Sequence, residues 1–250
     1  MNGNPRQTSP YPNVSNSPYL KRTRHAPRRK RKVLVLALLI LAIAVLAASA
    51  PVLIGRLSAH DGTGPNNGFA DLLAREESAH STPASEWRQG TVPHLYQIDP
   101  QWADEPYAGG DIRENGCGPT CLAMVYVALT GNTDYTPAEI ARFSEQNGFV
   151  ADGLTAWALM TDGAALLGIT GTEISADPDQ VRSALESGQP VICSVRPGDF
   201  TTTGHFIVLA GLAENGEVIV HDPNSAERSE RTWDLDRVLG QCANLWSFSA

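Results

Sequence analysis

Lysine is scarce in this sequence and is absent after residue 32. Residues 57–250 carry nine arginines against twenty-seven acidic residues, which gives this part of the chain a net charge of −18. Because binding to phosphates needs basic groups to neutralise them, we expect no nucleic acid to bind here. The other basic residues are concentrated at the start: residues 1–56 hold ten Lys and Arg and no acid.

Motifs for metal or nucleotide chemistry are also missing. No close Cys/His pair has the spacing of a zinc site, so we expect no metal. No nucleotide-binding or transporter motif is present, so we expect no cofactor and no peptide export by this chain. No internal repeat is apparent, and 250 residues leave room for one ordinary domain with extensions.

One long apolar run, residues 33–55, contains no charge. Its length exceeds the roughly 20 apolar residues that span a bilayer. Basic residues precede it and acids follow it, so the pattern predicts a single-pass transmembrane helix with a cytoplasmic N-terminus. A cleaved signal peptide is the competing interpretation, because Ala48-Ser-Ala50 resembles a cleavage site. Pro51 directly after that site and the length of the run favour the uncleaved anchor.

Composition divides the rest of the chain. Residues 1–32 are rich in Pro, Ser, Asn and Arg and predict a disordered basic cytoplasmic tail. Residues 56–90 are rich in small and polar residues and read as an extracytoplasmic linker. Residues 91–250 form the predicted catalytic domain. Helical patterns come first in it and strand patterns follow, which is typical of an α+β fold.

Within this domain, helices are expected at 119–129, 136–147 and 155–167, and from the cap at Asp177 to Gly188. Strands are expected at 190–196, 204–212, 217–222 and 243–248. A helical lobe should therefore meet an antiparallel sheet at a cleft.

The first expected helix is apolar on all sides, so it should be the buried central helix. Cys117 lies at its N-terminus, between Gly116 and Gly118. The helix dipole and free N–H groups there favour an anion, and hence a nucleophilic thiolate. The flanking glycines should leave Cys117 open on both sides. Cys121, one turn further on, fits a buried structural thiol better.

A base for such a nucleophile is expected on a hairpin. The strands at 204–212 and 217–222 are joined by a turn that contains Asn215-Gly216. If residues 212–215 form the tip, His205 stands directly opposite Asp222 on one face of the ladder. A carboxylate in that place orients an imidazole and stabilises its protonated form.

A set of short motifs runs through this domain in order. The motifs are Val92-Pro-His-Leu-Tyr-Gln-Ile-Asp-Pro-Gln-Trp102, Gly116-Cys-Gly-Pro-Thr120, Thr136-Pro137, Asp152-Gly-Leu-Thr155, Gly188-Gln-Pro-Val191, Gly204-His205 and His221-Asp-Pro223. In these motifs and their order the chain resembles the peptidase C-39-like family, whose members have papain-like cysteine peptidase folds related to double-glycine leader peptidase domains.

The resemblance implies a fold in which a helical lobe packs on an antiparallel sheet. It implies Cys117 as nucleophile, His205 as general base and Asp222 as the orienting residue. It also implies an oxyanion-hole glutamine upstream of the cysteine, for which Gln97 matches best. Asn115 is the alternative donor, and the backbone N–H of Cys117 would supply the second hydrogen bond.

Three cysteines remain besides Cys117. Cys193 and Cys242 both fall in expected strands, so a disulfide between them is one interpretation. Three buried free thiols, these two and Cys121, is the other.

Together these patterns predict a membrane-anchored extracytoplasmic cysteine peptidase that hydrolyses peptide amide bonds through a thioester. A cell-wall amidase or endopeptidase that acts on peptidoglycan is the enzymatic alternative. A non-catalytic surface module that retains the fold is the alternative of another class.

Overall fold

The computed structural model describes residues 79–250. The predicted tail, transmembrane helix and most of the predicted linker lie outside the described residues and stay predictions. In the described part, no helix combines the length and the apolar character needed to cross a bilayer.

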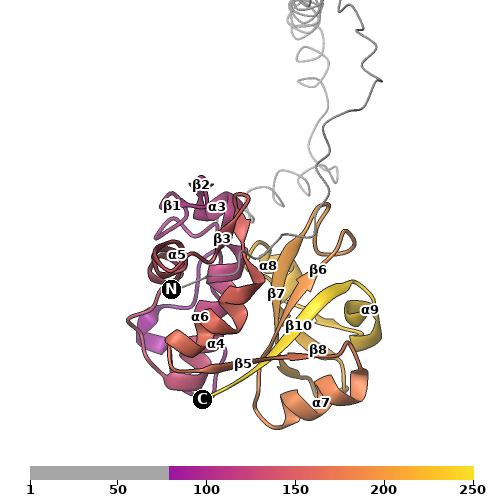
Figure 1. Ribbon diagram of the computed structural model, residues 1–250. Coiled ribbons are helices and arrows are strands. Elements are labelled where there is room, and N and C mark those ends of the chain that lie inside the picture. The colour runs from indigo at the N-terminus through magenta and orange to yellow at the C-terminus, as the bar shows by residue number, and fades with distance from the viewer. Residues whose placement is uncertain (1–78) are drawn as a thin grey trace, which may run out of the picture. The chain divides into compact units, whose positions relative to one another are not determined.

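The central element is helix α4 (Cys117–Thr130), which is buried along most of its length as expected (Figure 1). It begins at Cys117, the residue predicted to lie at its N-terminus. It ends at Gly131, whose φ of 70° is the left-handed conformation that closes many helices. The sequence interpretation of this helix is confirmed.

The other helical elements of the first half surround α4. Helix α5 (Pro137–Gln146) opens with the predicted capping box, in which the side chains of Thr136 and Glu139 each cap the other's backbone N–H. The remaining short elements there are η1 (Ala84–Glu86), β1 (Pro106–Tyr107), β2 (Gly110–Asp111), α3 (Ile112–Asn115), β3 (Val150–Ala151), β4 (Leu154–Thr155), η2 (Trp157–Met160) and α6 (Asp162–Leu166).

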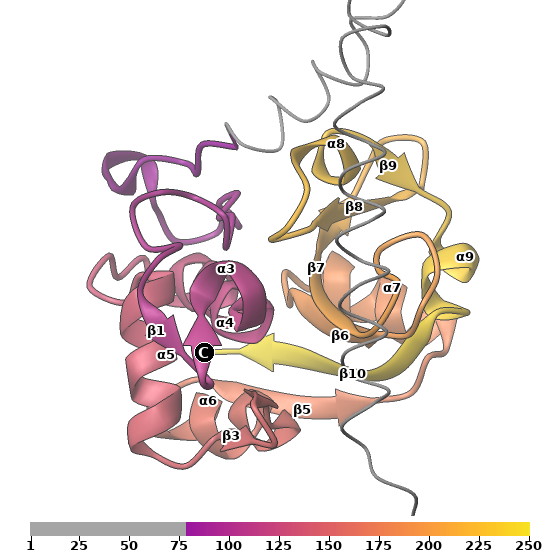
Figure 2. The same cartoon turned by 90° about the horizontal axis from the view of Figure 1, so that it is seen from above.

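The second half supplies all six strands of an antiparallel sheet. Its strands, in spatial order, are β5 (Thr170–Ile174), β10 (Cys242–Ser249), β6 (Val191–Val195), β7 (His205–Leu212), β8 (Val218–His221) and β9 (Thr232–Trp233). In Figure 2, one end of β5 and of β10 lies beside the helical half on the left, whereas β6–β9 lie on the right. The predicted α+β arrangement is confirmed.

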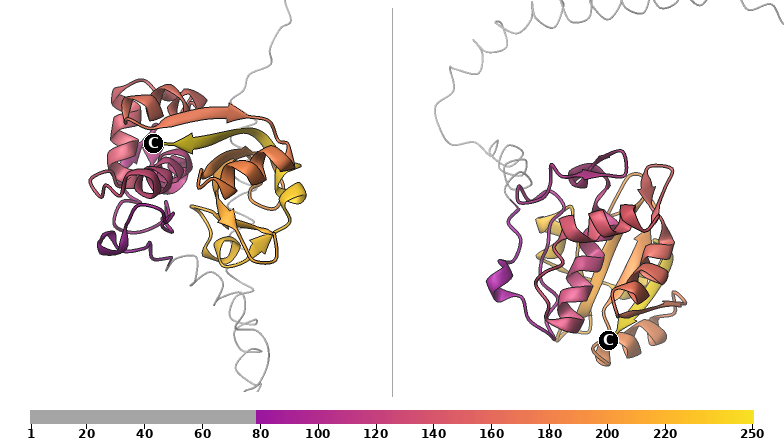
Figure 3. Two further views of the ribbon diagram at one scale, coloured as in Figure 1. Left: turned by 90° about the horizontal axis from the view of Figure 1, so that it is seen from below. Right: turned by 60° about the vertical axis from the view of Figure 1, so that its left-hand side comes forward.

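Apolar side chains on alternate positions bury both faces of this sheet. On β7, Phe206 and Val208 pack with α4, whereas Ile207 and Leu209 pack with the helices behind the sheet. Those helices are α7 (Pro178–Glu186) and α9 (Leu235–Leu239). Figure 3 shows α4 running beside the strands. The sheet is therefore fixed between two apolar layers, and the start of β7 is held beside the start of α4.

The helix expected at 155–167 is wrong. Asp152 and Gly153 both have positive φ, 52° and 75°, and they turn the chain into the β3–β4 hairpin. Thr155 is therefore in a strand, where its hydroxyl bonds the Tyr107 hydroxyl at 2.9 Å. Only the short elements η2 and α6 follow it.

The register predicted for the β7–β8 hairpin is also wrong. Val208, not His205, faces the end of β8, where it pairs with His221. The register shifts once more between Leu209 and Gly211, and Gly216 closes the turn with φ of 79°. The ladder, continued by one position, places Asp222 across from residue 207. The predicted partner residues are thus two positions out of register, and an even shift keeps them on the same face.

Candidate active site

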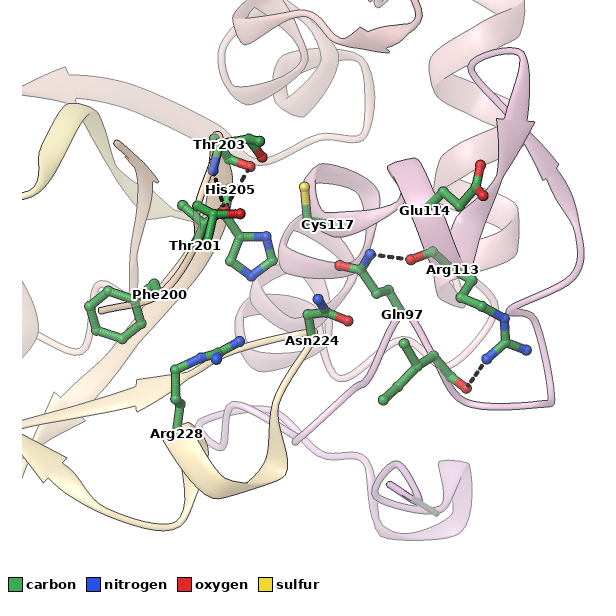
Figure 4. A pocket seen from close by; sticks show the side chains of 13 residues that line it. Gln97, Arg113, Glu114, Cys117, Phe200, Thr201, Thr203, His205, Asn224 and Arg228 are labelled. Atoms are coloured by element: carbon green, nitrogen blue, oxygen red, sulfur yellow. Dashed lines mark hydrogen bonds between the residues drawn. The ribbon is translucent and has the colours of Figure 1, made fainter. Parts of the chain in front are cut away.

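Cys117, His205 and Gln97 line one pocket of about 900 Å³ (Figure 4). One wall comes from the helical half of the domain and consists of Gln97, Ile98, Arg113, Glu114 and Cys117. The opposite wall comes from the sheet half and consists of residues 200–205, Asn224 and Arg228. The predicted cleft between a helical lobe and a sheet is present.

Cys117 is partly exposed at the first position of α4, whereas Cys121 is fully buried one turn further on. Burial raises the pKa of the Cys121 thiol well above its usual range, which keeps that thiol protonated and unreactive. The Gly116 N–H donates to the Ile112 carbonyl and Pro119 has no N–H, so the N–H groups of Cys117 and Gly118 are the ones that the start of α4 can offer to an anion. Of the two cysteines, only Cys117 has the surroundings of a nucleophile.

The glycines on either side of Cys117 were expected to leave that residue open to solvent, but they allow close packing instead. A Cβ on Gly118 would lie 2.6 Å from the Thr155 Cγ2 atom, and one on Gly116 would lie 2.5 Å from the Ile112 carbonyl oxygen. Both contacts are shorter than real Cβ atoms allow. The two glycines therefore let hairpin β3–β4 and helix α3 approach the start of α4 closely, which fixes where Cys117 lies.

His205, the first residue of β7, bonds Asp222 through Nε2, with the Nε2–Oδ1 distance at 2.7 Å. This bond leaves Nδ1 to face Cys117, and Figure 4 shows the imidazole between the sheet wall and the thiol. Burial by itself lowers the pKa of His205, but hydrogen bonds and charges from Asp222 and Cys117 outweigh burial and raise that pKa to about 10. The direction of this shift favours the protonated ring of His205.

Asp222 is completely buried and fully hydrogen-bonded. Its Oδ1 accepts from His205 and from the Asn224 N–H at 2.8 Å, and its Oδ2 accepts from Arg228 Nε at 2.6 Å. Burial raises the pKa of Asp222, but His205 and Arg228 outweigh it and hold that pKa below its usual value. The predicted His205–Asp222 contact is present despite the changed register. Its geometry is that of diagonal neighbours on a ladder.

Gln97 reaches the pocket although twenty residues separate it from Cys117. Its backbone N–H donates to the Pro223 carbonyl at 2.7 Å, which fastens the segment around Gln97 to the loop that carries Asp222. Its side-chain Nε2 donates one hydrogen to the Arg113 carbonyl at 2.6 Å. A primary amide has a second N–H besides the one bonded to Arg113, and the Oε1 atom of Gln97 is buried without a hydrogen-bond partner.

Asn115, the alternative donor, is turned away from this pocket. Its Nδ2 atom donates to the carbonyls of Tyr107 and Ala108 at 3.4 and 3.5 Å, and the residue is not among those that line the pocket. Between the two amides, the geometry favours Gln97.

Arg228 was missed by the sequence interpretation. The signal for it is Ser225, whose hydroxyl caps helix α8 (Ala226–Ser229) by accepting from the Arg228 N–H at 3.2 Å. A cap there turns the chain straight back after Asp222, so a side chain in the first helical turn returns to the carboxylate.

The remaining cysteines, Cys193 and Cys242, are free thiols on the neighbouring strands β6 and β10. Burial raises the pKa of Cys193 well above its usual range, and the adjacent Cys242 adds to the effect. In residues 79–250 no group of three or more His, Cys, Asp or Glu side chains is arranged to hold a metal ion.

Comparison with known proteins agrees with the resemblance read from the motifs. The model of the Peptidase_C39 like family matches residues 90–248. One solved structure with a similar fold is the peptidase domain of Streptococcus ComA, a bifunctional ABC transporter in a quorum-sensing pathway. It is 22% identical, with a TM-score of 0.43, over 54% of this chain and 92% of that chain. No curated protein sequence matches this chain. Because the family model covers well over half of its length, the chain belongs to the peptidase C39-like family.

Proposed function

We propose that this domain hydrolyses peptide amide bonds as a cysteine peptidase, with Cys117 as nucleophile. The observation that carries the proposal is the meeting of Cys117, His205 and Gln97 around one pocket, with the buried Asp222 bonded to His205. Each has the neighbours that its role requires. Family membership supports a peptidase, and the geometry supports this assignment of roles.

In the first half of the reaction, the Cys117 thiolate attacks the carbonyl carbon of the scissile amide and forms the C–S bond. The resulting oxyanion accepts hydrogen bonds from the second N–H of Gln97 and from the Cys117 backbone N–H. The C–N bond then breaks while His205 Nδ1 gives its proton to the leaving amine.

In the second half, water attacks the thioester carbon and gives its proton to the now neutral His205. The C–S bond breaks, the carboxylic product leaves, and the thiolate–imidazolium pair is restored. Asp222 holds the ring through Nε2 in both halves, so that Nδ1 always faces the sulfur.

A peptide substrate follows from membership of a peptidase family. Peptidoglycan stem peptides contain the same amide bond and remain the second candidate substrate. A binding module without activity is disfavoured, because nothing in simple binding needs a thiol, an imidazolium and a buried carboxylate in this order.

The proposed location of this activity rests on sequence. The basic tail, the apolar run at 33–55 and the acidic remainder support a single-pass anchor with the catalytic domain outside the cytoplasm. Recovery of the protein in the membrane fraction with residue 1 intact is the expected result. A soluble form that starts near Pro51 would show a cleaved signal instead.

The activity is tested on the full-length protein with a peptide library and with purified cell wall. Cys117→Ala should abolish turnover, because no other group forms the thioester. Cys121→Ser is the matched control: it changes a buried thiol one turn away, so it should lower stability and leave kcat near wild type. Loss of activity in Cys121→Ser together with retention in Cys117→Ser would assign the chemistry to the other cysteine.

A further inference from the structure

Arg228 links the interior of the site to its open pocket. Its Nε donates to the buried Oδ2 of Asp222, yet a quarter of the side chain is exposed and lines the pocket. A guanidinium has five N–H donors in a planar fork, and one is used on Asp222. The terminal nitrogens therefore remain for a ligand on the sheet wall.

The short helix α8 holds this side chain in place. Ser225 caps the helix at Arg228, and the Ser229 hydroxyl accepts from the Asp222 N–H at 2.9 Å and donates to the Ser225 carbonyl at 2.8 Å. Asp222, Ser225, Arg228 and Ser229 thus form one closed set of contacts. An arginine held in this way loses little side-chain freedom when it binds a ligand.

Charge at the site is asymmetric across the pocket. Two cations, the His205 imidazolium and Arg228, surround Asp222 on the sheet wall. Of the described residues that line the pocket, Glu114 is the one carboxylate, and it lies on the opposite, helical wall beside Arg113, which forms an ion pair with Asp104. Figure 4 shows Glu114 and Arg228 on opposite sides of Cys117. A ligand that crosses the nucleophile therefore meets positive charge on the His205 side.

We propose that Arg228 forms a subsite for a carboxylate in the leaving-group half of the substrate. The assignment to that half rests on the proposed function: the leaving amine must lie at His205, because His205 protonates it, and Arg228 shares the wall of His205. A planar fork suits a carboxylate, which it binds through two parallel hydrogen bonds. The favoured substrates are peptides with an acidic side chain or a free carboxyl end shortly after the scissile bond.

The proposal is tested by alkylation of Cys117 in the full-length protein with two reagents of nearly equal size. Iodoacetate carries the carboxylate, and iodoacetamide is its neutral counterpart. Each forms an S–C bond with the thiolate and releases iodide. Both rates depend on the same thiolate, so any general change in its reactivity cancels from the ratio of iodoacetate to iodoacetamide rates.

Arg228→Gln should lower this ratio by about tenfold, the size of one lost hydrogen bond between charged groups. Arg228→Lys keeps the charge without the planar fork, so its ratio should lie between those of the wild type and of Arg228→Gln. Arg142→Gln is the matched control, because it removes one exposed arginine that pairs with Glu139 on α5, away from the pocket. The control should leave the ratio unchanged.

A ratio that is unchanged in both Arg228 variants would overturn the subsite while leaving the peptidase intact. If neither reagent labels Cys117 of the wild type at neutral pH, the proposed function itself fails, and the subsite fails with it. Should Arg228→Gln not fold, Arg228→Lys decides: a fall in its ratio supports the subsite, and a ratio equal to that of the control overturns it.

Discussion

Two buried histidines on adjoining strands of this domain have pKa values shifted in opposite directions. His205 begins β7 and His221 ends β8, and they are 8% and 6% exposed. The pKa of His205 is raised to about 10, whereas that of His221 is lowered to about 3. Burial alone lowers both, so burial does not explain the difference.

The difference lies in the partners. Asp222 and Cys117 stabilise the charged ring of His205. His221 instead stacks on His94, with ring centroids 3.6 Å apart, and its Nδ1 lies 3.2 Å from the Pro93 carbonyl. Burial and the repulsion of a second histidine lower the pKa of His221, and the carbonyl only partly opposes them. In the proposed mechanism one histidine is thus the proton donor at the nucleophile, while the other packs against His94 with a lowered pKa.

The largest effect, a loss of kcat, should appear when the two histidines are substituted one at a time. His205→Ala removes the acid and base of the reaction and should lower kcat by at least about 10³-fold. His221→Phe keeps a stacked ring against His94 and should leave kcat within about threefold, at a stability cost of about 1 kcal/mol for the unpaired Pro93 carbonyl. Peptide turnover and thermal unfolding measure the two effects.

Loss of turnover in a folded His221→Phe protein would place His221 in the chemistry and contradict the comparison. A folded His205→Ala protein with nearly normal kcat would also contradict the comparison, because it would remove His205 from the chemistry.

An intermediate effect is expected from Asp222→Asn, which removes one of the two groups that keep His205 charged. We expect kcat to fall by a factor on the order of 10–10³, less than in serine enzymes, because the thiolate still pairs with the imidazolium. The pKa of His205, followed by NMR, should fall because its anionic partner is gone.

Asp177→Asn is the matched control for this change. It neutralises a carboxylate that caps α7 on the far side of the sheet, and asparagine caps a helix equally well. Both kcat and the His205 titration should stay at their wild-type values. If Asp222→Asn leaves the His205 titration unchanged as well, Asp222 is not what holds the proton there.

Helix α4 was predictable from sequence because its signals are local. An apolar run marks a buried helix, and Gly131 is a natural C-terminal stop for it. The capping box at Thr136 is local in the same way. Cys117 was identified from its place at the helix start, which needs no tertiary information.

The hairpin shows where local signals end. Asn215-Gly216 marks the turn, but the register also depends on the irregularity between Leu209 and Gly211, which no nearby residue pattern specifies. The His205–Asp222 contact was predicted from the wrong register and is present because the error is an even number of residues. Strand β5 was missed, since most of its residues are exposed and its pairing partner, β10, lies far along the chain.

Arg228 and Gln97 depend still more on tertiary structure. Gln97 was assigned by family resemblance, and what brings it to Cys117 is a backbone bond to the Pro223 carbonyl, over a hundred residues away. Arg228 depends on the direction in which α8 turns. The cap at Ser225 indicates that turn only once Asp222 is known to face the site.

The smallest expected effect is on stability as a function of pH, where the two histidines act in opposite directions. The folded-state pKa of His205 is raised from 6.5 to about 10, so its contribution is complete below pH 6.5 and is lost as the pH rises through 10. The folded-state pKa of His221 is lowered from 6.5 to about 3, so its contribution is present above pH 6.5 and is lost as the pH falls toward 3.

The His205 contribution falls above pH 6.5 and the His221 contribution falls below it, so the unfolding free energy should be greatest near pH 6.5. Urea titrations from pH 4 to 10 would measure this dependence. The pKa of His94 is lowered by burial and that of Asp222 is also lowered, so both add to the loss on the acid side. Each slope has its own variant: His221→Phe should flatten the acid side, and Asp222→Asn should flatten the alkaline side because it removes the main group that raises the His205 pKa. An alkaline slope that survives Asp222→Asn unchanged would mean that His205 is not the group that titrates there.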